Sequence, residues 1–437
     1  MRKLLALIAV APLAACSLQD DDGNNNYSCS DGDQKRFVRD ASLDWYLWND
    51  LLPRKKDIKV GDYDSPSALL ADLISVQPLD DFSYIGSAAA DQAFFGAGQY
   101  EGYGFGWKRV ATDDIRLTHV FSSSPAADAG FARGQRIVAI DGRSMAEIEA
   151  AEGFEAALEG VVMASFTMRE TDGVTEFTVD VTEGTVTIDP VPQWRLIPRT
   201  GTTPIAYIEF ASFVSTADAR LDALFADLVA NDVSDVILDL RYNGGGLVAT
   251  ANLLGDLLGG AVAEDQIFTR TLYNADRADE HNSVQQLDRL LNSINLSRLV
   301  VIATPRTASA SELVTNGLEP HVEVTIVGDR TFGKPVGQAG WEFCGNVLRL
   351  TAFQTVNADG FGDYFGGLPA DCQAADDLNV PVGDAADPSL VAAETWLDTG
   401  ACPPSPLQSP FDRSELRVED ARKDGPDVPW REFANAW

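Results

Sequence analysis

The amino-acid sequence predicts a multidomain α/β protein, in which a small N-terminal helical domain and a β-rich domain precede an α/β core with mostly parallel strands. The chain has 437 residues, which is enough for two to three separate hydrophobic cores. Apolar residues follow a helical spacing through residues 31–90 and form short alternating stretches through 91–185. Strand-like and helix-like segments then alternate through 186–402.

Each segment has its own pattern. In 31–90, the apolar spacing is interrupted by Pro53 and Pro66, which predicts short helices with turns between them. In the core, the runs PIAYIEFASF, DVILDL and RLVVIA are interpreted as strands. We expect helices over 217–230, through LVATANLLGDLL, and after Ser309. This alternation is typical of a parallel sheet with helices packed against it.

The chain is strongly acidic, with a formal net charge of −33. This charge argues against nucleic acid or an anionic lipid surface as a partner bound through charge. A metal site is disfavoured, because the sequence has no Cys-x-x-Cys or His-x-x-x-His spacing. The histidines are His119, His281 and His321. None has a recognisable catalytic context, so each is interpreted as a surface or turn residue, and we expect no cofactor.

Residues 1–16, MRKLLALIAVAPLAAC, have a basic start and an apolar run that fits a secretion signal and is too short for a stable membrane span. Leu-Ala-Ala-Cys at its end resembles the bacterial lipoprotein box, which implies lipid attachment to Cys16. Ser17 resembles an outer-membrane sorting residue, so we expect an outer-membrane lipoprotein that faces the periplasm. An ordinary secretion signal is the alternative. Residues 17–30 are a predicted flexible tether.

The other cysteines are Cys29, Cys344, Cys372 and Cys402. In an oxidising compartment this even number predicts two disulfides, with three possible connectivities among which the sequence does not choose. Free buried thiols are the alternative.

Within 91–185, the stretch SSSPAADAGFARGQRIVAIDGRSM resembles a PDZ domain. Upstream, YGFGW stands where that family has the loop whose amides hold a peptide carboxylate, so the resemblance assigns this role to Tyr103, Gly104, Phe105 and Gly106. It implies that a substrate tail adds as a strand to a sheet edge. For YGFGW alone, a glycine-rich turn beside buried aromatic residues is the alternative.

The C-terminal residues 403–437 begin PPSPLQSP and form a predicted surface extension. They end in REFANAW, in which a free carboxylate behind apolar Trp437 resembles a PDZ ligand. The tail is therefore a secondary candidate for binding to the PDZ-like segment of the same chain or of a neighbour.

Two loops carry candidate chemistry. In TASASELVTNGLEP, Ser309 precedes Glu312 by three residues, which by itself fits a capping box at a helix start. In DVILDLRYNGGG, three glycines separate a strand from a helix, and such a turn gathers backbone amides suited to an anion. A dinucleotide-phosphate loop is disfavoured, because the glycines do not match the full fingerprint. An oxyanion hole is the other use.

Together with DRTFGKPVGQ, these loops resemble the S41 family of C-terminal processing serine proteases, which have a DLR-x-N-x-GG loop, an SASE nucleophile and T-x-GK followed by a glutamine. The match runs over residues 90–360. The resemblance implies a Ser309 nucleophile, a Lys334 general base and a Gln338 that orients the lysine. Ser311 competes within SASE, but the family's spacing to the lysine fits Ser309.

The same resemblance implies an oxyanion hole formed by the amides of Ala310 and Gly245, with Gly246 as the near alternative. Two departures from the family pattern bear on the resting geometry. Pro335 stands where the family has a glycine, and TPRTA precedes SASE where a Gly-Ser pair is usual. A resting state that substrate assembles through the PDZ domain is therefore an open alternative.

A serine hydroxyl needs a neighbour that accepts its proton, and a neutral lysine is the base available here. Lowering the pKa of Lys334 from about 10.4 to about 7 requires roughly 4.6 kcal/mol from its surroundings. Burial must provide this against the negative charge of the chain. We therefore expect Lys334 to be buried and activity to fall below neutral pH. An exposed lysine after a turn is the alternative.

The sequence thus predicts a serine endopeptidase that acts on extracytoplasmic proteins or peptides selected by their free C-termini. A non-catalytic lipoprotein that binds peptides or apolar ligands on the same scaffold is the alternative. The presence of Ser309, Lys334 and Gln338 together favours the peptidase, because a binding protein has no need for the set.

Overall fold

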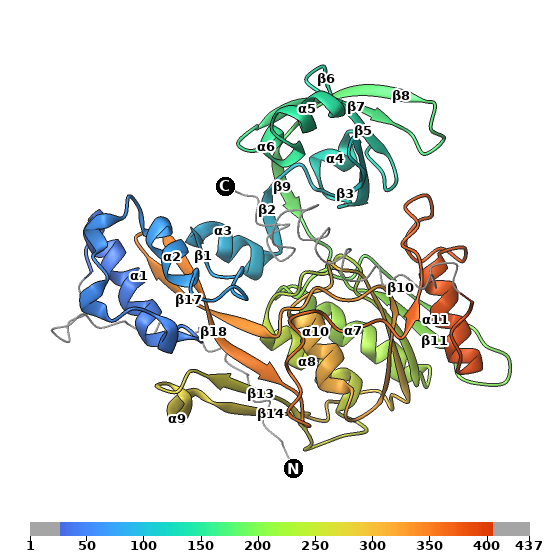
Figure 1. Ribbon diagram of the computed structural model, residues 1–437. Helices are drawn as coiled ribbons and strands as arrows, with labels where there is room; N and C mark the ends of the chain where they lie inside the picture. The colour runs from blue at the N-terminus through green and yellow to red at the C-terminus, as the bar shows by residue number, and fades with distance from the viewer. Residues whose placement is uncertain (1–26, 405–437) are drawn as a thin grey trace, which may run out of the picture. The chain divides into compact units, whose positions relative to one another are not determined.

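The computed structural model describes residues 27–404 (Figure 1). Its described residues form two compact units, the first of 27–89, 273–277 and 338–353 and the second of 90–272, 278–337 and 354–404. The predicted signal segment with Cys16, most of the tether and all but the first residues of the C-terminal extension lie outside the described residues. Along 27–404, no helix has the length and hydrophobicity needed to cross a bilayer.

The first unit begins with two helices whose starts are capped by serine. Ser30 accepts a hydrogen bond from the Asp33 amide, and Ser65 accepts one from the Ala68 amide ahead of Pro66 in the first helical position. The helices are α1 (Asp31–Trp45) and α2 (Pro66–Ile74), joined by 3-10 turns at Asn49–Leu51, Lys55–Asp57 and Val60–Asp62. The unit also contains β1 (Tyr84–Ser87) and most of β17 (Val336–Phe343) and β18 (Asn346–Val356), with β1 and β17 each paired to β18.

The core of this unit draws on segments more than 250 residues apart in sequence. Phe37 of α1 stacks on Phe343 of β17, and Trp45 packs at a tilt against Trp341. Leucines of α2 and β18 belong to the same cluster. The sequence pattern assigned 338–353 to the protease core, but the structure places them here, because the apolar faces of α1 and α2 need a partner and these strands provide it.

The described cysteines pair as Cys29–Cys344 and Cys372–Cys402. The first bond joins the segment before α1 to the turn between β17 and β18 and spans 315 residues of sequence. The second lies within the second unit and joins β19 (Cys372–Gln373) to the segment after α11 (Pro388–Thr399). This pairing chooses one of the three connectivities that the sequence left open.

In the second unit, residues 99–187 form a β-rich subdomain around its own hydrophobic core. Its sheet runs in the order β3-β4-β5-β7-β8, with β6 paired to β5 and β3 at one edge. The elements are β2 (Gln99–Gly102), β3 (Phe105–Ala111), β4 (Asp114–Val120), α4 (Pro125–Asp128), β5 (Arg136–Ile140), β6 (Arg143–Ser144), α5 (Met145–Ala151), α6 (Phe154–Leu158), β7 (Met163–Arg169), β8 (Glu176–Thr182) and β9 (Gly184–Thr187). The two ends of the subdomain, β2 and β9, pair antiparallel. β2 follows α3 (Ala88–Gln92) and a short π-helix at Ala93–Ala97.

The remainder of the second unit is an α/β layer. Its sheet runs β10-β11-β12-β15-β16-β19, and every pairing from β11 to β19 is parallel. The elements are β10 (Gln193–Ile197), β11 (Ile205–Glu209), α7 (Ala217–Ala230), β12 (Asp235–Asp239), α8 (Val248–Gly259), β15 (Arg298–Ala303), α10 (Ala310–Leu318), β16 (Glu323–Gly328) and α11 (Pro388–Thr399). A hairpin of β13 (Ile267–Tyr273) and β14 (Ser283–Gln286), with α9 (Ala278–His281) at its tip, follows α8.

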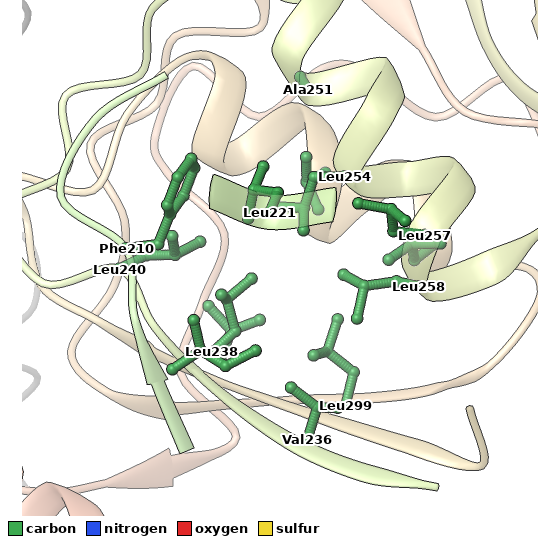
Figure 2. Packing of buried hydrophobic residues seen from close by; sticks show 14 of the residues in the cluster. Phe210, Leu221, Val236, Leu238, Leu240, Ala251, Leu254, Leu257, Leu258 and Leu299 are labelled. Atoms are coloured by element: carbon green, nitrogen blue, oxygen red, sulfur yellow. The ribbon is translucent and has the colours of Figure 1, made fainter. Parts of the chain in front are cut away.

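Helices cover both faces of this sheet, and the alternation of side chains along each strand determines the contacts. Val236 and Leu238 of β12 belong to the core formed with α7, α8 and α10, whereas Ile237 belongs to the cluster formed with α11. Figure 1 shows α11, in red, on the side of the sheet away from the other three helices. Figure 2 shows Val236, Leu238 and Leu299 directed toward the leucines of α8.

The topology brings two chain segments together at one edge of the sheet. Asp239 at the end of β12 pairs with Ile302 near the end of β15, so the loops that follow both strands lie at the carboxyl ends of neighbouring parallel strands. In open α/β sheets this edge is where functional sites form. Residues 240–247 (the glycine loop) lead into α8, and residues 304–309 (the nucleophile loop) lead into α10.

Candidate functional site: a serine and a lysine held by one carboxylate

Ser309 ends the nucleophile loop in an unusual backbone conformation, with φ 57° and ψ −115°. For a residue other than glycine, such a conformation costs of order 1–3 kcal/mol and is found most often at functional sites. The residue is half-buried, and α10 begins at the next position. The fold thus holds Ser309 at a helix start in a conformation that an ordinary cap does not need.

Ser311, the competing serine, has a different environment. Its side chain is completely buried, and its hydroxyl donates a hydrogen bond of 3.0 Å to the carbonyl of Asn243. A hydroxyl in this position is committed to holding the two loops together. The geometry therefore favours Ser309 over Ser311 as the reactive serine.

Asn243 of the glycine loop is the main link between the loops. Its carbonyl also accepts the amide of Ala308 at 3.0 Å, and its side-chain nitrogen donates to the carbonyl of Phe210 at 2.7 Å. Thr307 adds a bond from its hydroxyl to the carbonyl of Leu240 at 2.8 Å. Because Asn243 is fully buried, these bonds fix the nucleophile loop against the end of β12.

Glycine is required at the two positions considered for the oxyanion hole. A Cβ on Gly245 would lie 2.8 Å from the Ala310 amide nitrogen and 2.8 Å from the Ser309 Cβ, and one on Gly246 would lie 2.2 Å from the Phe213 carbonyl. Gly245 therefore lies directly beside the serine. Its own amide donates to Asn243 Oδ1 at 2.9 Å in this structure, and the assignment of Gly245 or Gly246 as the oxyanion donor stays a prediction.

Glu312 connects the serine to the lysine. Its Oε2 accepts the backbone amides of both Ser309, at 2.9 Å, and Lys334, at 2.8 Å. Its Oε1 accepts the amide of Gly333 at 2.7 Å and the hydroxyl of Thr331. Burial raises the pKa of this carboxyl, and the donated hydrogen bonds oppose the increase. One fully buried carboxylate thus holds the backbones of both predicted catalytic residues.

Lys334 is buried, with 4% of the residue exposed, as the sequence argument expects and contrary to the surface alternative. Gly333 before it has φ 98°, and a Cβ there would lie 2.4 Å from the Phe365 carbonyl. Pro335 after it provides a carbonyl that accepts the Thr355 amide at 3.0 Å. The proline therefore fits the local backbone, and the lysine stays inside the protein.

Arg241 fixes the start of the glycine loop through two buried ion pairs. Its guanidinium pairs with Asp239 at the end of β12 and with Asp387, the N-cap of α11, and the side chains of all three are at most 2% exposed. Burial opposes the charge of Arg241, but the two carboxylates raise its pKa well above the usual value. The Asp-Leu-Arg sequence thus has a structural role in tying the glycine loop to the helix on the other face of the sheet.

Two protein-family models match the chain. The model of peptidase family S41 matches residues 204–371, which contain Ser309, Lys334 and the glycine loop. The model of the peptidase S41 N-terminal domain matches residues 33–84, which contain α2 and most of α1. The chain belongs to peptidase family S41.

Individual relatives agree with this S41 assignment. The chain is 28% identical over 244 residues to the chloroplastic C-terminal processing peptidase of Tetradesmus obliquus, covering 51% of this chain and 48% of the relative. It is 29% identical over 250 residues to the carboxyl-terminal-processing protease of a Picosynechococcus species, covering 56% of this chain and 57% of the relative. The chain thus spans about half the length of the curated relatives that it matches.

Solved structures share the S41 fold with this chain. A Bacteroides fragilis protein assigned to the S41 proteases superposes with a TM-score of 0.65 at 23% identity, covering 84% of this chain and 97% of that one. The photosystem II D1 C-terminal processing protease superposes with a TM-score of 0.53 at 20% identity, covering 83% and 100%. At these identities the likeness concerns the fold.

Gln338 and residues 103–106 are the remaining predicted site residues in the described part of the chain. Gln338 belongs to the first unit, where its side-chain nitrogen donates to the carbonyl of Phe82, so its role toward Lys334 stays a prediction. Tyr103 and Gly104 directly precede the edge strand β3, and Phe105 and Gly106 begin it. The carbonyls of Tyr103 and Gly104 accept backbone amides within the subdomain. Carboxylate binding at this segment also stays a prediction.

The interpretation of His119 as a surface or turn residue is wrong. His119 lies in β4 and its ring stacks on Tyr242 of the glycine loop, with ring centroids 5.4 Å apart and an interplanar angle of 28°. Burial lowers the pKa of its imidazole to about 3. The sequence does not indicate this environment, because the partner Tyr242 is distant in sequence and only the fold brings the two rings together.

The positions missed from the sequence are those whose partners come from distant elements: Asn243, Thr307, Asp376 and Asp387. Asp387 lies 146 residues after Arg241 and directly precedes α11, and no local pattern around it predicts an ion pair. The glycine loop offered one usable signal. An asparagine before Gly-Gly-Gly suits a turn in which its side chain bonds an amide two residues later, as observed for Gly245.

Replacing Glu312 by glutamine is expected to reduce the kcat/KM of peptide hydrolysis about 100-fold, because a displacement of about 1 Å in a catalytic group has that effect. Glutamine keeps the shape, but its NH2 group would face amide donors that now point at a carboxylate oxygen. Steady-state kinetics of Glu312→Gln measures this. Glu319→Gln, at an exposed position after the same helix, is the matched control, and equal kinetics for both variants would contradict the prediction.

Proposed function

We propose that this S41 chain is a serine endopeptidase that uses Ser309 and Lys334 as a dyad. The observation that carries the proposal concerns the Glu312 carboxylate. One of its two oxygens, Oε2, accepts hydrogen bonds from the backbone amides of both residues. Ser309 has a strained conformation at a helix start, and Lys334 is buried and belongs to the same hydrogen-bond network. Hydrolysis of an amide bond without a histidine requires such a nucleophile and such a base.

In the acylation step, the neutral amine of Lys334 takes the hydroxyl proton as Ser309 Oγ attacks the carbonyl carbon of the scissile peptide bond. The carbonyl oxygen becomes an oxyanion in the tetrahedral intermediate. The amide of Ala310 is free of an intrahelical partner because it lies in the first turn of α10, and it donates to this oxygen together with a glycine-loop amide. The lysine then returns its proton to the leaving amine as the C–N bond breaks.

In the deacylation step, water attacks the ester formed on Ser309, and Lys334 again accepts the proton. The ester bond breaks, Ser309 recovers its proton from the lysine, and the product carboxylate leaves. Both steps need an uncharged lysine, and burial favours the neutral form of an amine. Gln338 orients the lysine in this proposal.

The β-rich subdomain is, in this proposal, a PDZ domain that selects substrates by their C-termini. β3 lies at the edge of its sheet, which suits addition of an extended peptide as a further strand. Residues 103–106 lie at the start of this edge strand, where the amides for a terminal carboxylate are needed. Protein or peptide chains with free C-termini are therefore the proposed substrates.

We also propose that a lipid on Cys16 anchors the protein to the bacterial outer membrane, on the periplasmic side. The support is the sequence LAAC at the end of a signal-like segment, together with cysteines that pair as disulfides, which fits an oxidising compartment. Labelling of the expressed chain with a radioactive fatty acid, compared with Cys16→Ala, tests the anchor.

The function is tested with two peptides of identical sequence, one ending in a free carboxylate and the other in a carboxamide. We expect cleavage of both, with a KM at least about tenfold higher for the carboxamide, because the charged end loses its hydrogen bonds to the PDZ amides. Equal KM values would contradict selection by the C-terminus. Absence of cleavage together with absence of labelling by a serine-reactive phosphonate would favour the non-catalytic binding protein.

A further inference from the structure

The β-rich subdomain contacts the glycine loop and the nucleophile loop, here called the catalytic loops, through two arginine–aromatic contacts. In one contact the arginine belongs to the subdomain, and in the other it belongs to the nucleophile loop. Arg133 of the subdomain lies over the ring of Tyr242 in the glycine loop, with its guanidinium carbon 5.8 Å from the ring centroid. Arg306 of the nucleophile loop lies over the ring of Trp107 in β3, at 5.9 Å. Each catalytic loop therefore has a partner in the subdomain.

Arg133 is the central residue of this interface. Within its own subdomain, Nη1 donates to the Thr118 carbonyl at 2.6 Å, and across the interface it donates to Tyr242 Oη at 2.7 Å. Nη2 donates to Asp376 Oδ1 at 2.7 Å, and Nε donates to the Val380 carbonyl at 2.9 Å. The side chain is only 11% exposed. The planar guanidinium donates hydrogen bonds both within the subdomain and to residues outside it, and this arrangement fixes the geometry of the contact.

Tyr242 is the residue through which this contact reaches the site. It is 6% exposed, and it has φ 62°, a strained value for tyrosine. Its hydroxyl donates to Asp376 and accepts from Arg133, and His119 stacks on its ring. The next residue is Asn243, whose carbonyl holds the nucleophile loop. Three groups outside the glycine loop thus hold the tyrosine that precedes the oxyanion glycines.

The second contact leads to the serine. Arg306 is 6% exposed and lies three residues before Ser309, in the TPRTA segment that departs from the S41 pattern. Trp107 follows directly after residues 103–106 and packs on Phe154 of α6 at a centroid distance of 4.7 Å. The nucleophile loop is therefore in contact with the strand proposed to receive the substrate tail.

We infer that Arg133 and Tyr242 are positioning residues for hydrolysis, so that the β-rich subdomain supports the catalytic loops in addition to selecting substrates. The inference rests on the proposed function. Its distinct consequence is that breaking the contact slows the turnover of a substrate whose C-terminus the subdomain does not recognise. A subdomain that only selects tails would leave that turnover unchanged.

The experiment uses the full chain and the carboxamide peptide, which removes tail recognition from the measurement. We expect Arg133→Ala to lower kcat about 5- to 150-fold, the usual range for coupling between sites, with KM changed less than about threefold. Arg133→Lys keeps a charge near Tyr242 and Asp376 and should recover part of kcat. Tyr242→Phe removes only the hydroxyl and should lower kcat in the same direction.

The matched control is Arg143→Ala, which removes an arginine that pairs with Glu152 on the exposed surface of the same subdomain. A double variant of Arg133→Ala and Tyr242→Phe should cost less than the product of the single effects, because both act through one contact. If Arg133→Ala does not fold, as judged by its thermal unfolding, Arg133→Lys and Tyr242→Phe carry the test. Wild-type kcat in the folded variants would overturn the inference, whereas an inactive wild-type protein would overturn the proposed function instead.

Discussion

Replacing Ser309 by alanine is expected to lower kcat for peptide hydrolysis by at least about ten-thousand-fold, because no other group can form the acyl intermediate. The backbone amides around the site remain, so substrate binding should change little. Steady-state kinetics and labelling by a fluorescent phosphonate measure the loss. Ser309 is half-buried and lies beside Gly245, so its hydroxyl is accessible to attack the carbonyl carbon of a substrate or the phosphorus atom of the phosphonate.

Ser311→Ala is the matched control for this result, since it removes the same hydroxyl two residues away. Its bond to the Asn243 carbonyl is lost, which should lower the free energy of unfolding by about 1 kcal/mol and leave kcat within about tenfold of the wild type. Phosphonate labelling that is lost in Ser311→Ala but retained in Ser309→Ala would reverse the assignment of the nucleophile.

Segments with strong local signals were predicted well from the sequence. The helix expected at 217–230 is α7, Ala217–Ala230, and the strands expected in DVILDL and RLVVIA are β12 and β15. These segments have apolar spacing that only one kind of element can bury. The partners of α1 and α2 could not be predicted in the same way. They come from 338–353, and an apolar helix face does not specify which distant strand will cover it.

In the candidate site too, residues within short sequence motifs were predictable, whereas contacts between distant segments were not. Ser309 and Lys334 stand out because short motifs surround them, and the structure brings their backbones to one carboxylate. Glu312 was interpreted from the sequence as a helix cap, and its bond to the Ser309 amide agrees with that. Its bonds to Gly333 and Lys334 were not predictable, because they depend on how the chain after β16 folds back over α10. Arg133 had no signal at all within its loop.

The second large effect is expected at Lys334. Lys334→Met keeps an unbranched side chain of similar length in the buried site but removes the amine, so kcat should fall at least about a thousandfold. Lys334→Arg should be equally inactive at every pH, because an arginine does not lose its proton in a protein. Lys56→Met, at an exposed position, is the control for loss of one positive charge and should keep full activity.

The pH dependence of the wild-type protein separates a catalytic lysine from a structural one. A general base works only when it is unprotonated, so kcat/KM should rise as the pH increases through the neutral range and fall as the pH decreases from 7 toward 5. The sign is opposite to that expected if a charged Lys334 held the substrate, because that role would be lost at high pH. A rate that stays flat from pH 5 to 9 in a folded protein, or an active Lys334→Arg variant, would contradict the dyad. Either result would require another base, and the carboxylate of Glu312, already engaged by the amides of Ser309 and Lys334, is poorly placed to provide it.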